Sequence, residues 1–393
     1  MREVFIVSGV RTPIGNFGGG LKDVPAADLG VLAVKETLKR INLEAKKIHE
    51  LIFGHARQAG NGPNIARQIA FGAGIPQEVP SYTINKACGS GLKAIILGYQ
   101  EIVLGNAEVI VAGGTENMSR IPFMLDGARW GYRMGNGELV DLMYRDGYFC
   151  PLANALMGRT AENLVEKYSI SREQQDVFAK QSQDRAIKAI DNGIFEKETV
   201  SVKVKDRKGK VTEVKVDEHP RRRVTLDKLA KLPPVFEKGG TVTAGNSSGI
   251  TDAAASVILM SKEKALELGV KPLLKIIDYA IAGVDPSIMG IAPVPATRKL
   301  FKKTGMNMNK IDLIELNEAF AAQVIAVERE IDLDRSKLNV NGGAIALGHP
   351  TGATGARIVV TLLHEILRRE VNIGLATLCV SGGMGLSMLI ERV

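Results

Sequence analysis

The fold of this chain is decided by a stretch that occurs twice, as IHELIFGH at residues 48–55 and as IDLIELNE at residues 311–318. Each copy has the pattern of a short buried strand that runs into a turn. Each copy also follows a basic amphipathic helix pattern, at residues 32–40 and 296–304. The chain therefore contains a candidate internal repeat.

Two more pairs of segments match in the same order. Residues 273–282 resemble the opening strand, and residues 374–380 resemble residues 109–114. One match would be weak, but several in one order predict a duplicated α/β unit.

Short runs rich in Val and Ile alternate with helical periodicity in the N-terminal part, which is typical of a sheet with helices on its faces. We expect strands at 4–8, 50–55, 81–85 and 109–113, and helices at 26–41, 64–72 and 90–104.

The texture changes at Met118, where Gly, Arg, Tyr and Met become frequent and strand patterning stops. Polar helices such as 171–192 follow, and the sheet pattern returns after residue 249. We expect an N-terminal half at 1–265, with an inserted loop domain at about 118–249, and a C-terminal half at 266–393.

Length and composition support a globular protein of two units. The chain has 393 residues, 45% of them hydrophobic and 24% charged. It starts directly with a strand pattern, and no apolar run approaches the roughly 20 residues that span a bilayer. We therefore expect a cytoplasmic protein that does not enter a membrane.

The net charge of +8 raises the question of nucleic acid binding, and much of this charge lies between Lys203 and Lys238. Aromatic residues make up only 5% of the chain and do not accompany these cations, so we expect no nucleic acid partner. A small ligand with phosphate groups fits the segment better, and a solvated basic loop is the alternative.

Three cysteines, Cys88, Cys150 and Cys379, are too few and too scattered for a disulfide framework or a zinc site. Cys88 lies in NKACGSG, residues 85–91, immediately before a predicted helix. Free N–H groups and the helix dipole at such a turn would lower the pKa of the thiol and could hold an oxyanion. An inert buried thiol is the alternative for Cys88.

His349 lies in the glycine-rich run NGGAIALGHPTGATG, residues 341–355, before the helix predicted at 356–367. A helix N-terminus disfavours the imidazolium, so a neutral base is expected there. In the duplicated scheme, His349 occupies the position that Cys88 has in the first half.

Cys379 ends an apolar strand pattern at 375–379 and enters the turn SGGMG at residues 381–385. Such a thiol faces a cleft, whereas Cys150 has no glycine turn and is predicted to be structural. A nucleophilic thiol with a base forms a thioester, and a second thiol can move a proton on carbon next to a carbonyl.

Four blocks of this chain resemble the signature blocks of thiolases: CGSG at 88–91, NEAF at 317–320, NGGA through GHP at 341–350, and Cys379 with its glycine turn. The resemblance covers essentially the whole chain. It implies a thiolase-like α/β fold with duplicated halves in α-β-α-β-α layers. It also implies an acyl-CoA C-acyltransferase, in particular an acetyl-CoA acetyltransferase.

The resemblance also implies roles for the site residues. Cys88 would carry the acyl group, His349 would take its proton, and Cys379 would protonate a departing group and then abstract an α-proton. Backbone N–H groups of Cys88 and Ser381 would hold the oxyanion, and Asn317 would hold a water at the enolate.

Acyl-CoA substrates and CoA are the implied partners, with no metal and no redox cofactor. Arg221 is the cation expected near the CoA nucleotide and Ser248 lies near the pantetheine, while Met157, Phe236 and Met289 would line the acyl pocket or, alternatively, simply pack. A homo-oligomer, a dimer of dimers, is implied, with residues 126–141 as a candidate contact.

Two positions depart from the family pattern, and both leave the acyl-chain length open. Leu156 stands where many acetoacetyl-CoA-forming members have histidine, and Ser381 stands where glycine is common. A degradative 3-ketoacyl-CoA thiolase and a non-catalytic acyl-CoA-binding scaffold are the alternatives. A ketoacyl-synthase-like condensing enzyme is disfavoured because it would not need Cys379.

Overall fold

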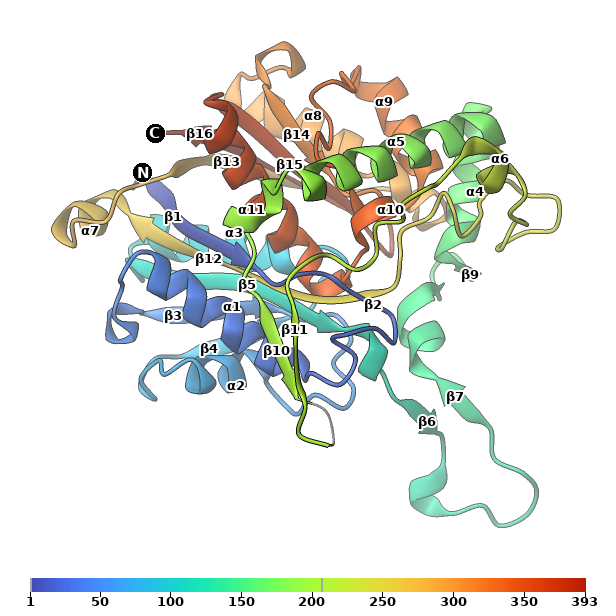
Figure 1. Ribbon diagram of the computed structural model, residues 1–393, viewed down its shortest axis with the longest axis horizontal. Helices are drawn as coiled ribbons and strands as arrows, with labels where there is room; N and C mark the ends of the chain where they lie inside the picture. Colours follow the sequence, from blue (N-terminus) through green and yellow to red (C-terminus); the bar gives the residue numbers. More distant parts are fainter. Residues whose placement is uncertain (1, 206–207) are drawn as a thin grey trace.

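The computed structural model describes residues 2–205 and 208–393, so Arg207 of the basic segment lies outside the described residues. Figure 1 shows two α/β halves stacked on each other. The N-terminal half contributes the strands β1 (Val4–Arg11), β3 (Glu50–Gly54), β4 (Ser81–Ile84), β5 (Val109–Asn117) and β12 (Thr251–Ser261), and the short β2 (Gly15–Asn16). The C-terminal half contributes β13 (Leu274–Gly283), β14 (Leu313–Leu316), β15 (Ile373–Val380) and β16 (Met384–Arg392).

Strand pairing confirms the duplication. In the first half β3 is parallel to β5, β5 is antiparallel to β12, and β12 is antiparallel to β1. In the second half β14, β15, β16 and β13 repeat this order and these directions. The counterpart of β4 is reduced to a single bridge between Ile314 and Leu338.

The two halves meet at β1 and β13. Phe5 pairs with Lys275 and Ile6 pairs with Leu274 in an antiparallel register. This pairing joins the strands of both halves into one path, β14-β15-β16-β13-β1-β12-β5-β3-β4.

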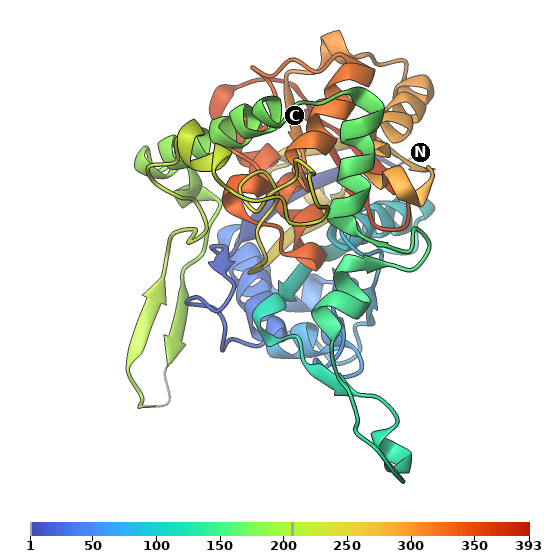
Figure 2. The ribbon, with the colours of Figure 1, turned by 90° about the vertical axis from the view of Figure 1, so that its right-hand side faces the viewer.

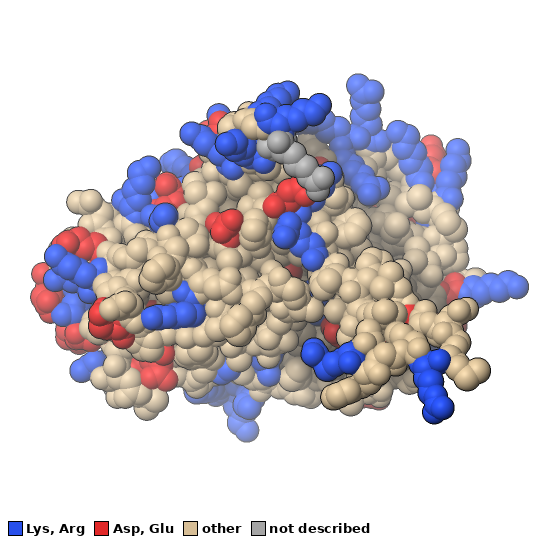
Figure 3. Space-filling model, turned by 90° about the horizontal axis from the view of Figure 1, so that it is seen from below, with Lys and Arg blue, Asp and Glu red and all other residues tan. Residues whose placement is uncertain are grey.

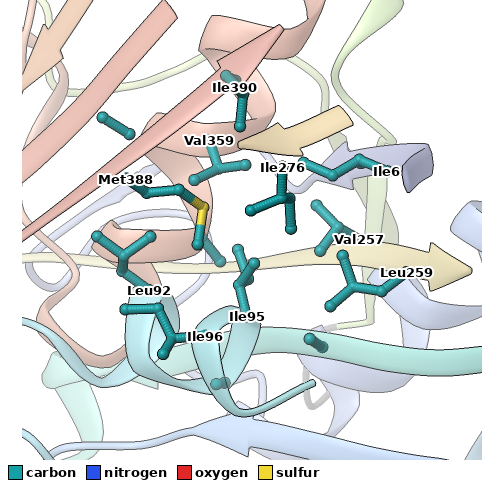
Figure 4. Close-up of a cluster of buried hydrophobic side chains, with 14 of the residues drawn as sticks. Ile6, Leu92, Ile95, Ile96, Val257, Leu259, Ile276, Val359, Met388 and Ile390 are labelled. Atoms are coloured by element: carbon teal, nitrogen blue, oxygen red, sulfur yellow. The ribbon is translucent and has the colours of Figure 1, made fainter. Parts of the chain in front are cut away.

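Two helices fill the space between the halves, namely α3 (Ser90–Leu104) and α11 (Thr351–Arg369). Figure 4 shows their side chains meeting those of strands from both halves, for example Ile95 against Val257 and Val359 near Ile390. The outer faces carry α1 (Ala26–Arg40) and α2 (Ile65–Gly72) on the first half, and α8 (Pro293–Thr304) and α9 (Ala321–Ile331) on the second. The predicted α-β-α-β-α layering is therefore confirmed.

Period-two patterning explains how each strand serves two layers. On β5, Ile110 and Ala112 face the central helices, whereas Val109 and Val111 face α1 and α2. Since both faces are covered, the strand begins with a continuous apolar run at residues 109–112.

The central helices begin where the candidate residues lie, and one start differs from the prediction. The helix expected from Ala356 begins at Thr351, because the Glu116 carboxylate accepts hydrogen bonds from Thr351 Oγ1 (2.9 Å) and Gly352 N (2.8 Å). Similarly, α8 begins at Pro293, a residue suited to the first helical turn.

The chain leaves the sheet after Asn117 and returns at Thr251. The expectation that strands are absent from this segment is wrong, because three two-stranded hairpins occur in it. Strands of two to four residues are too short to show a sequence period. The segment contains β6 (Phe123–Leu125), β7 (Leu139–Asp141), β8 (Phe149–Cys150), β9 (Ala155–Leu156), α4 (Met157–Tyr168), α5 (Arg172–Asp191), β10 (Val202–Lys205), β11 (Val211–Val214) and α6 (Leu226–Ala230).

Figure 2 shows the β6–β7 and β10–β11 hairpins projecting from the body of the molecule. The remaining α-helices of the described residues are α7 (Lys262–Glu267), which follows β12, and α10 (Ala344–Leu347), which precedes His349. No helix in the described ranges is both long and apolar enough to cross a bilayer.

Candidate active site

Cys88 lies in a tight turn between β4 and α3. Ala87 adopts a left-handed conformation with φ of 45°, and its N–H donates to Asn85 Oδ1 at 2.9 Å. Ser90 Oγ accepts from Lys86 N at 2.8 Å and donates to Ala87 O at 2.7 Å. These local bonds hold a backbone geometry that presents the thiol at the start of the helix.

Burial raises the pKa of the Cys88 thiol, so the predicted lowering of this pKa is wrong. The Arg57 guanidinium and the backbone N–H groups of Ser381 and Cys88 oppose this effect without overcoming it. The thiol therefore needs a base to become a thiolate. The same two N–H groups, which were expected to hold an oxyanion, converge on the sulfur.

His349 is 8% exposed, and its tautomer follows from its neighbour. The Thr354 hydroxyl donates its one proton to Pro350 O (3.0 Å), so it must accept from His349 Nδ1–H, which lies 2.7 Å away. The Nε2 atom then carries a lone pair, and it is buried without a partner among the described residues. Burial, together with the charges of Arg357 and Arg57, lowers the pKa of His349 to about 3. His349 is thus a neutral imidazole with a free acceptor atom.

Cys379 is the penultimate residue of β15 and is 2% exposed. Burial raises the pKa of its thiol, and the nearby Cys88 raises it further. The structure therefore brings together the thiols of Cys88 and Cys379, which lie 291 positions apart in the sequence. Cys150 is also buried, at 3%, and packs in the same apolar cluster as Cys379.

Asn317 directly follows β14 and is fully buried. Its backbone N–H donates to Thr377 O at 3.1 Å, which fixes the residue against β15. Neither Oδ1 nor Nδ2 of its side chain has a partner within the described part of the chain. Because a buried amide is costly to leave unpaired, this side chain is suited to bind a substrate atom or a water.

A cavity of about 600 Å³ lies near the site, but Cys88, His349, Asn317 and Cys379 do not themselves line it. Its wall includes Arg221, Ser248, Met157 and Phe236, four of the five residues predicted to bind substrate. It also includes Gly249, whose carbonyl accepts from His349 N at 2.9 Å, so the cavity adjoins the base. The fifth predicted residue, Met289, does not line this cavity but packs with Met157, Phe320 and Cys379.

Arg221 is exposed and is the one Lys or Arg that the described residues contribute to the cavity wall. No group of three His, Cys, Asp or Glu side chains that could hold a metal ion occurs in residues 2–205 and 208–393.

Sequence reasoning missed a buried group of charges beneath the site. Glu116, the eighth residue of β5, accepts from the backbone N–H groups of Ala56 and Arg57 and contacts His55 Nδ1 at 3.0 Å. Burial alone would raise the pKa of Glu116, but His55 and Arg57 lower it to about 2. The Glu116 carboxylate therefore joins the end of β3 to the start of α11.

Thr354 and Tyr148 were missed as well. Thr354 orients His349 five residues away, and the helix pattern after His349 was the only signal for it. Tyr148 lines the cavity from a short π-helix, Tyr144–Tyr148, that carried no sequence signal. Both contributions depend on contacts that form only in the folded chain.

Comparison with known proteins identifies the relatives of this chain. Residues 4–263 match the family described as thiolase, N-terminal domain, and residues 270–392 match thiolase, C-terminal domain. The chain is 54% identical over 396 residues to an acetyl-CoA acetyltransferase of Syntrophomonas wolfei and 52% identical over 392 residues to one of Pseudomonas aeruginosa, with 100% of both chains covered in each case.

Two solved structures superpose closely on it. A crystal structure of Bacillus anthracis acetyl-CoA acetyltransferase matches with a TM-score of 0.98 and 48% identity, covering 100% of this chain and 99% of that one. Human mitochondrial 3-ketoacyl-CoA thiolase in complex with CoA matches with a TM-score of 0.96 and 43% identity, covering 100% and 98%. With its two stacked halves and its paired thiols, this chain belongs to the thiolase family.

Proposed function

We propose that the protein is an acetyl-CoA acetyltransferase that converts two acetyl-CoA into acetoacetyl-CoA and CoA, reversibly, through an acyl group on Cys88. The observation that carries this proposal is the close contact of α3 and α11, at Gly91 and Ala356, which places the helix starts next to Cys88 and His349 close together. Cys379 lies near enough to Cys88 for Cys88 to raise the pKa of the Cys379 thiol. The names of the two bacterial relatives support the proposal.

In the first step, Nε2 of His349 takes the proton of Cys88, and the sulfur attacks the carbonyl carbon of the first acetyl-CoA. The N–H groups of Cys88 and Ser381 would stabilise the oxyanion, since both already point at the sulfur. The C–S bond to CoA then breaks, and the departing CoA sulfur takes the proton of Cys379. The acetyl group remains on Cys88 as a thioester.

In the second step, the Cys379 thiolate removes an α-proton from a second acetyl-CoA. The enolate oxygen would be held by His349 and by a water on the side-chain amide of Asn317, whose atoms have no partner among the described residues. The enolate carbon attacks the acetyl carbon, the bond to Cys88 breaks, and Cys88 regains its proton from His349. No net proton is gained or lost.

The proposed chemistry needs no metal and no redox cofactor, because a thioester carbonyl already acidifies its α-proton and the electron count of the substrates does not change. CoA and acyl-CoA are the only partners that the reaction requires. We place it in the cytoplasm, where free thiols such as these three persist.

The cavity is our candidate for the site of both the CoA moiety and the acyl chain, since Arg221, Ser248, Met157 and Phe236 all line it. Ser248 lies next to Gly249 near the base, and Arg221 provides positive charge for a phosphate. Lys and Arg also gather around the tip of the β10–β11 hairpin, beside the grey residues in Figure 3.

Reversing charge at Arg221, as Arg221→Glu, should raise KM for acetyl-CoA with little change in kcat.

We also propose that the protein forms a dimer of dimers through the β6–β7 hairpin. This hairpin exposes large apolar side chains, with Trp130 88% and Met134 90% exposed, which is unfavourable in a monomer. Light scattering coupled to gel filtration should give a tetramer, and Trp130→Ser with Met134→Ser should give a dimer. A wild-type monomer would contradict this assignment.

A second candidate function is thiolysis of longer 3-ketoacyl-CoA. The apolar side chain of Leu156 lines the cavity, and the human 3-ketoacyl-CoA thiolase is among the close structural matches. Comparing kcat/KM for acetoacetyl-CoA with that for a medium-chain 3-ketoacyl-CoA separates the two. Equal or better use of the longer substrate would reject an acetoacetyl-specific enzyme.

The nucleophile itself is tested by labelling. Iodoacetamide should modify Cys88 stoichiometrically, acetyl-CoA should block the reaction, and Cys88→Ala should abolish both labelling and turnover. Cys150→Ala is the matched control and should behave as wild type. Labelling confined to Cys150 would contradict the proposal, and labelling of Cys88 without turnover would favour an acyl-CoA-binding scaffold.

A further inference from the structure

Arg57 is a buried cation that the proposed reaction does not use. It follows β3 and is only 8% exposed. Its guanidinium donates from Nη1 to Asp146 O (3.2 Å) and from Nη2 to Gly147 O (3.0 Å). One planar fork thus holds two consecutive carbonyls of the inserted segment.

The backbone of Arg57 is fixed from behind. Its N–H donates to Glu116 Oε1 at 3.1 Å, and the same carboxylate holds the start of α11. The guanidinium packs directly on the main chain at Gly147, where an added Cβ would lie 3.0 Å from Arg57 Nε. Arg57 therefore connects the sheet to the inserted segment through hydrogen bonds at both its backbone and its guanidinium.

The segment that Arg57 holds, Asp146 and Gly147, leads directly into the cavity wall. Tyr148 follows Gly147 and lines the cavity together with Tyr144, and their rings pack edge to face with centroids 6.1 Å apart. Burial raises the pKa of Tyr148, which Arg57 opposes and the neighbouring Cys88 increases, so the phenol is neutral. The next residue, Phe149, pairs with Leu156, another residue of the cavity wall.

We propose that Arg57 is a positioning residue that holds Tyr148 in the cavity wall that Met157 and Phe236 also line, and thereby limits the length of the acyl chain that the site accepts. This inference rests on the proposed function. The guanidinium meets two carbonyls at once, whereas the single ammonium of lysine at this position would keep the charge but hold at most one of them firmly. Arg57→Lys would therefore weaken the hold on Tyr148 while it keeps the positive charge.

The test compares thiolysis of 3-ketohexanoyl-CoA and acetoacetyl-CoA. Arg57→Lys should raise the ratio of kcat/KM for the longer over the shorter substrate by about threefold to tenfold, part of the discrimination that a well-fitted pocket achieves per methylene. Tyr148→Ala should raise the same ratio. The double variant should raise it no further than Tyr148→Ala alone, because Arg57 acts through Tyr148.

Arg67→Lys is the matched control. Arg67 also donates to two backbone carbonyls, Val79 O at 2.7 Å and Gln77 O at 2.6 Å, but it does not line the cavity. An unchanged ratio in Arg57→Lys, or one equal to that of Arg67→Lys, would overturn the inference, as would additive effects in the double variant. If Arg57→Lys does not fold, an unchanged ratio in Tyr148→Ala still overturns it. A wild-type protein that thiolyses neither substrate would instead refute the proposed function.

Discussion

The base strength of His349 depends on one hydroxyl group. Thr354 Oγ1 accepts the Nδ1 proton and leaves Nε2 free to take the proton of Cys88. Burial and two arginines keep the ring neutral, so its orientation and tautomer matter more than its charge. The buried Thr354 side chain thus determines which nitrogen of His349 can act as the base.

Thr354→Val should lower kcat by about 10- to 100-fold with little change in KM, because the imidazole loses the acceptor that fixes its tautomer. Steady-state kinetics with acetoacetyl-CoA and CoA provide the measurement. Thr354→Ser keeps the hydroxyl and is the matched control. Equal losses in both variants would point to a packing role for Thr354.

The lowered pKa of His349 also makes stability depend on pH. Its pKa is about 3 in the folded state and about 6.5 in an unfolded chain, so the unfolded state binds a proton that the folded state does not. Stability must therefore fall as the pH drops below about 6.5. Between pH 7.5 and pH 5.5 wild type should lose about 1.4 kcal/mol more than His349→Gln.

Urea unfolding of both proteins at the two pH values measures this difference. His219 and His364, whose pKa values are also lowered by burial, are present in both proteins and cancel in the comparison. Identical pH dependence would mean that His349 titrates normally in the folded protein.

At the scale of elements, the site depends on how closely α3 approaches α11. A Cβ on Gly91 would lie 2.7 Å from Ala356 N, and one on Gly355 would collide with Leu92 N. The glycines therefore let two helix backbones touch, and these helices start beside Cys88 and His349. The distance between nucleophile and base is set by this contact.

Gly355→Ala should destabilise the protein by about 1–3 kcal/mol and lower kcat, because backbone atoms rather than a flexible side chain must move. Urea unfolding and steady-state kinetics measure the two effects. Gly283→Ala is the control, since its added Cβ would have its nearest neighbour 3.8 Å away. Full activity in Gly355→Ala would show that the site tolerates a wider helix spacing.

At the scale of the whole molecule, one buried cation ties the inserted segment to the sheet. Arg11, at the end of β1, is fully buried and pairs with Glu198 at 2.5 Å and with Asp217 at 2.7 Å. Asp217 also accepts from Ile14 N at 2.8 Å. The insertion that carries Arg221 is thus anchored on the N-terminal half.

Arg11→Met should destabilise the protein by about 3–5 kcal/mol, because it leaves two buried carboxylates without their partner. Arg222→Met removes the exposed pair with Asp191 and should leave the urea midpoint unchanged. A small effect of Arg11→Met would mean that water reaches Glu198 and Asp217.

Asn317 was a candidate only through the resemblance to thiolases. Local patterns in the sequence were sufficient for the repeat, for most strands and helices of both halves, and for the candidate residues Cys88, His349 and Cys379. Each depends on short-range signals, namely apolar periodicity or a reactive side chain in a glycine turn. The same signals left the hairpins of the insertion undetected, since strands this short have no measurable period.

Only the tertiary structure decided the electrostatics of the site. The sequence alone predicted a lowered pKa for Cys88 from its helix, but burial outweighs that effect and raises the pKa. Likewise, Arg57, Glu116 and Thr354 act through partners distant in sequence or through a specific rotamer. Desolvation and hydrogen-bond geometry depend on the packing of the whole chain, whereas strand and helix patterns depend on neighbours along it.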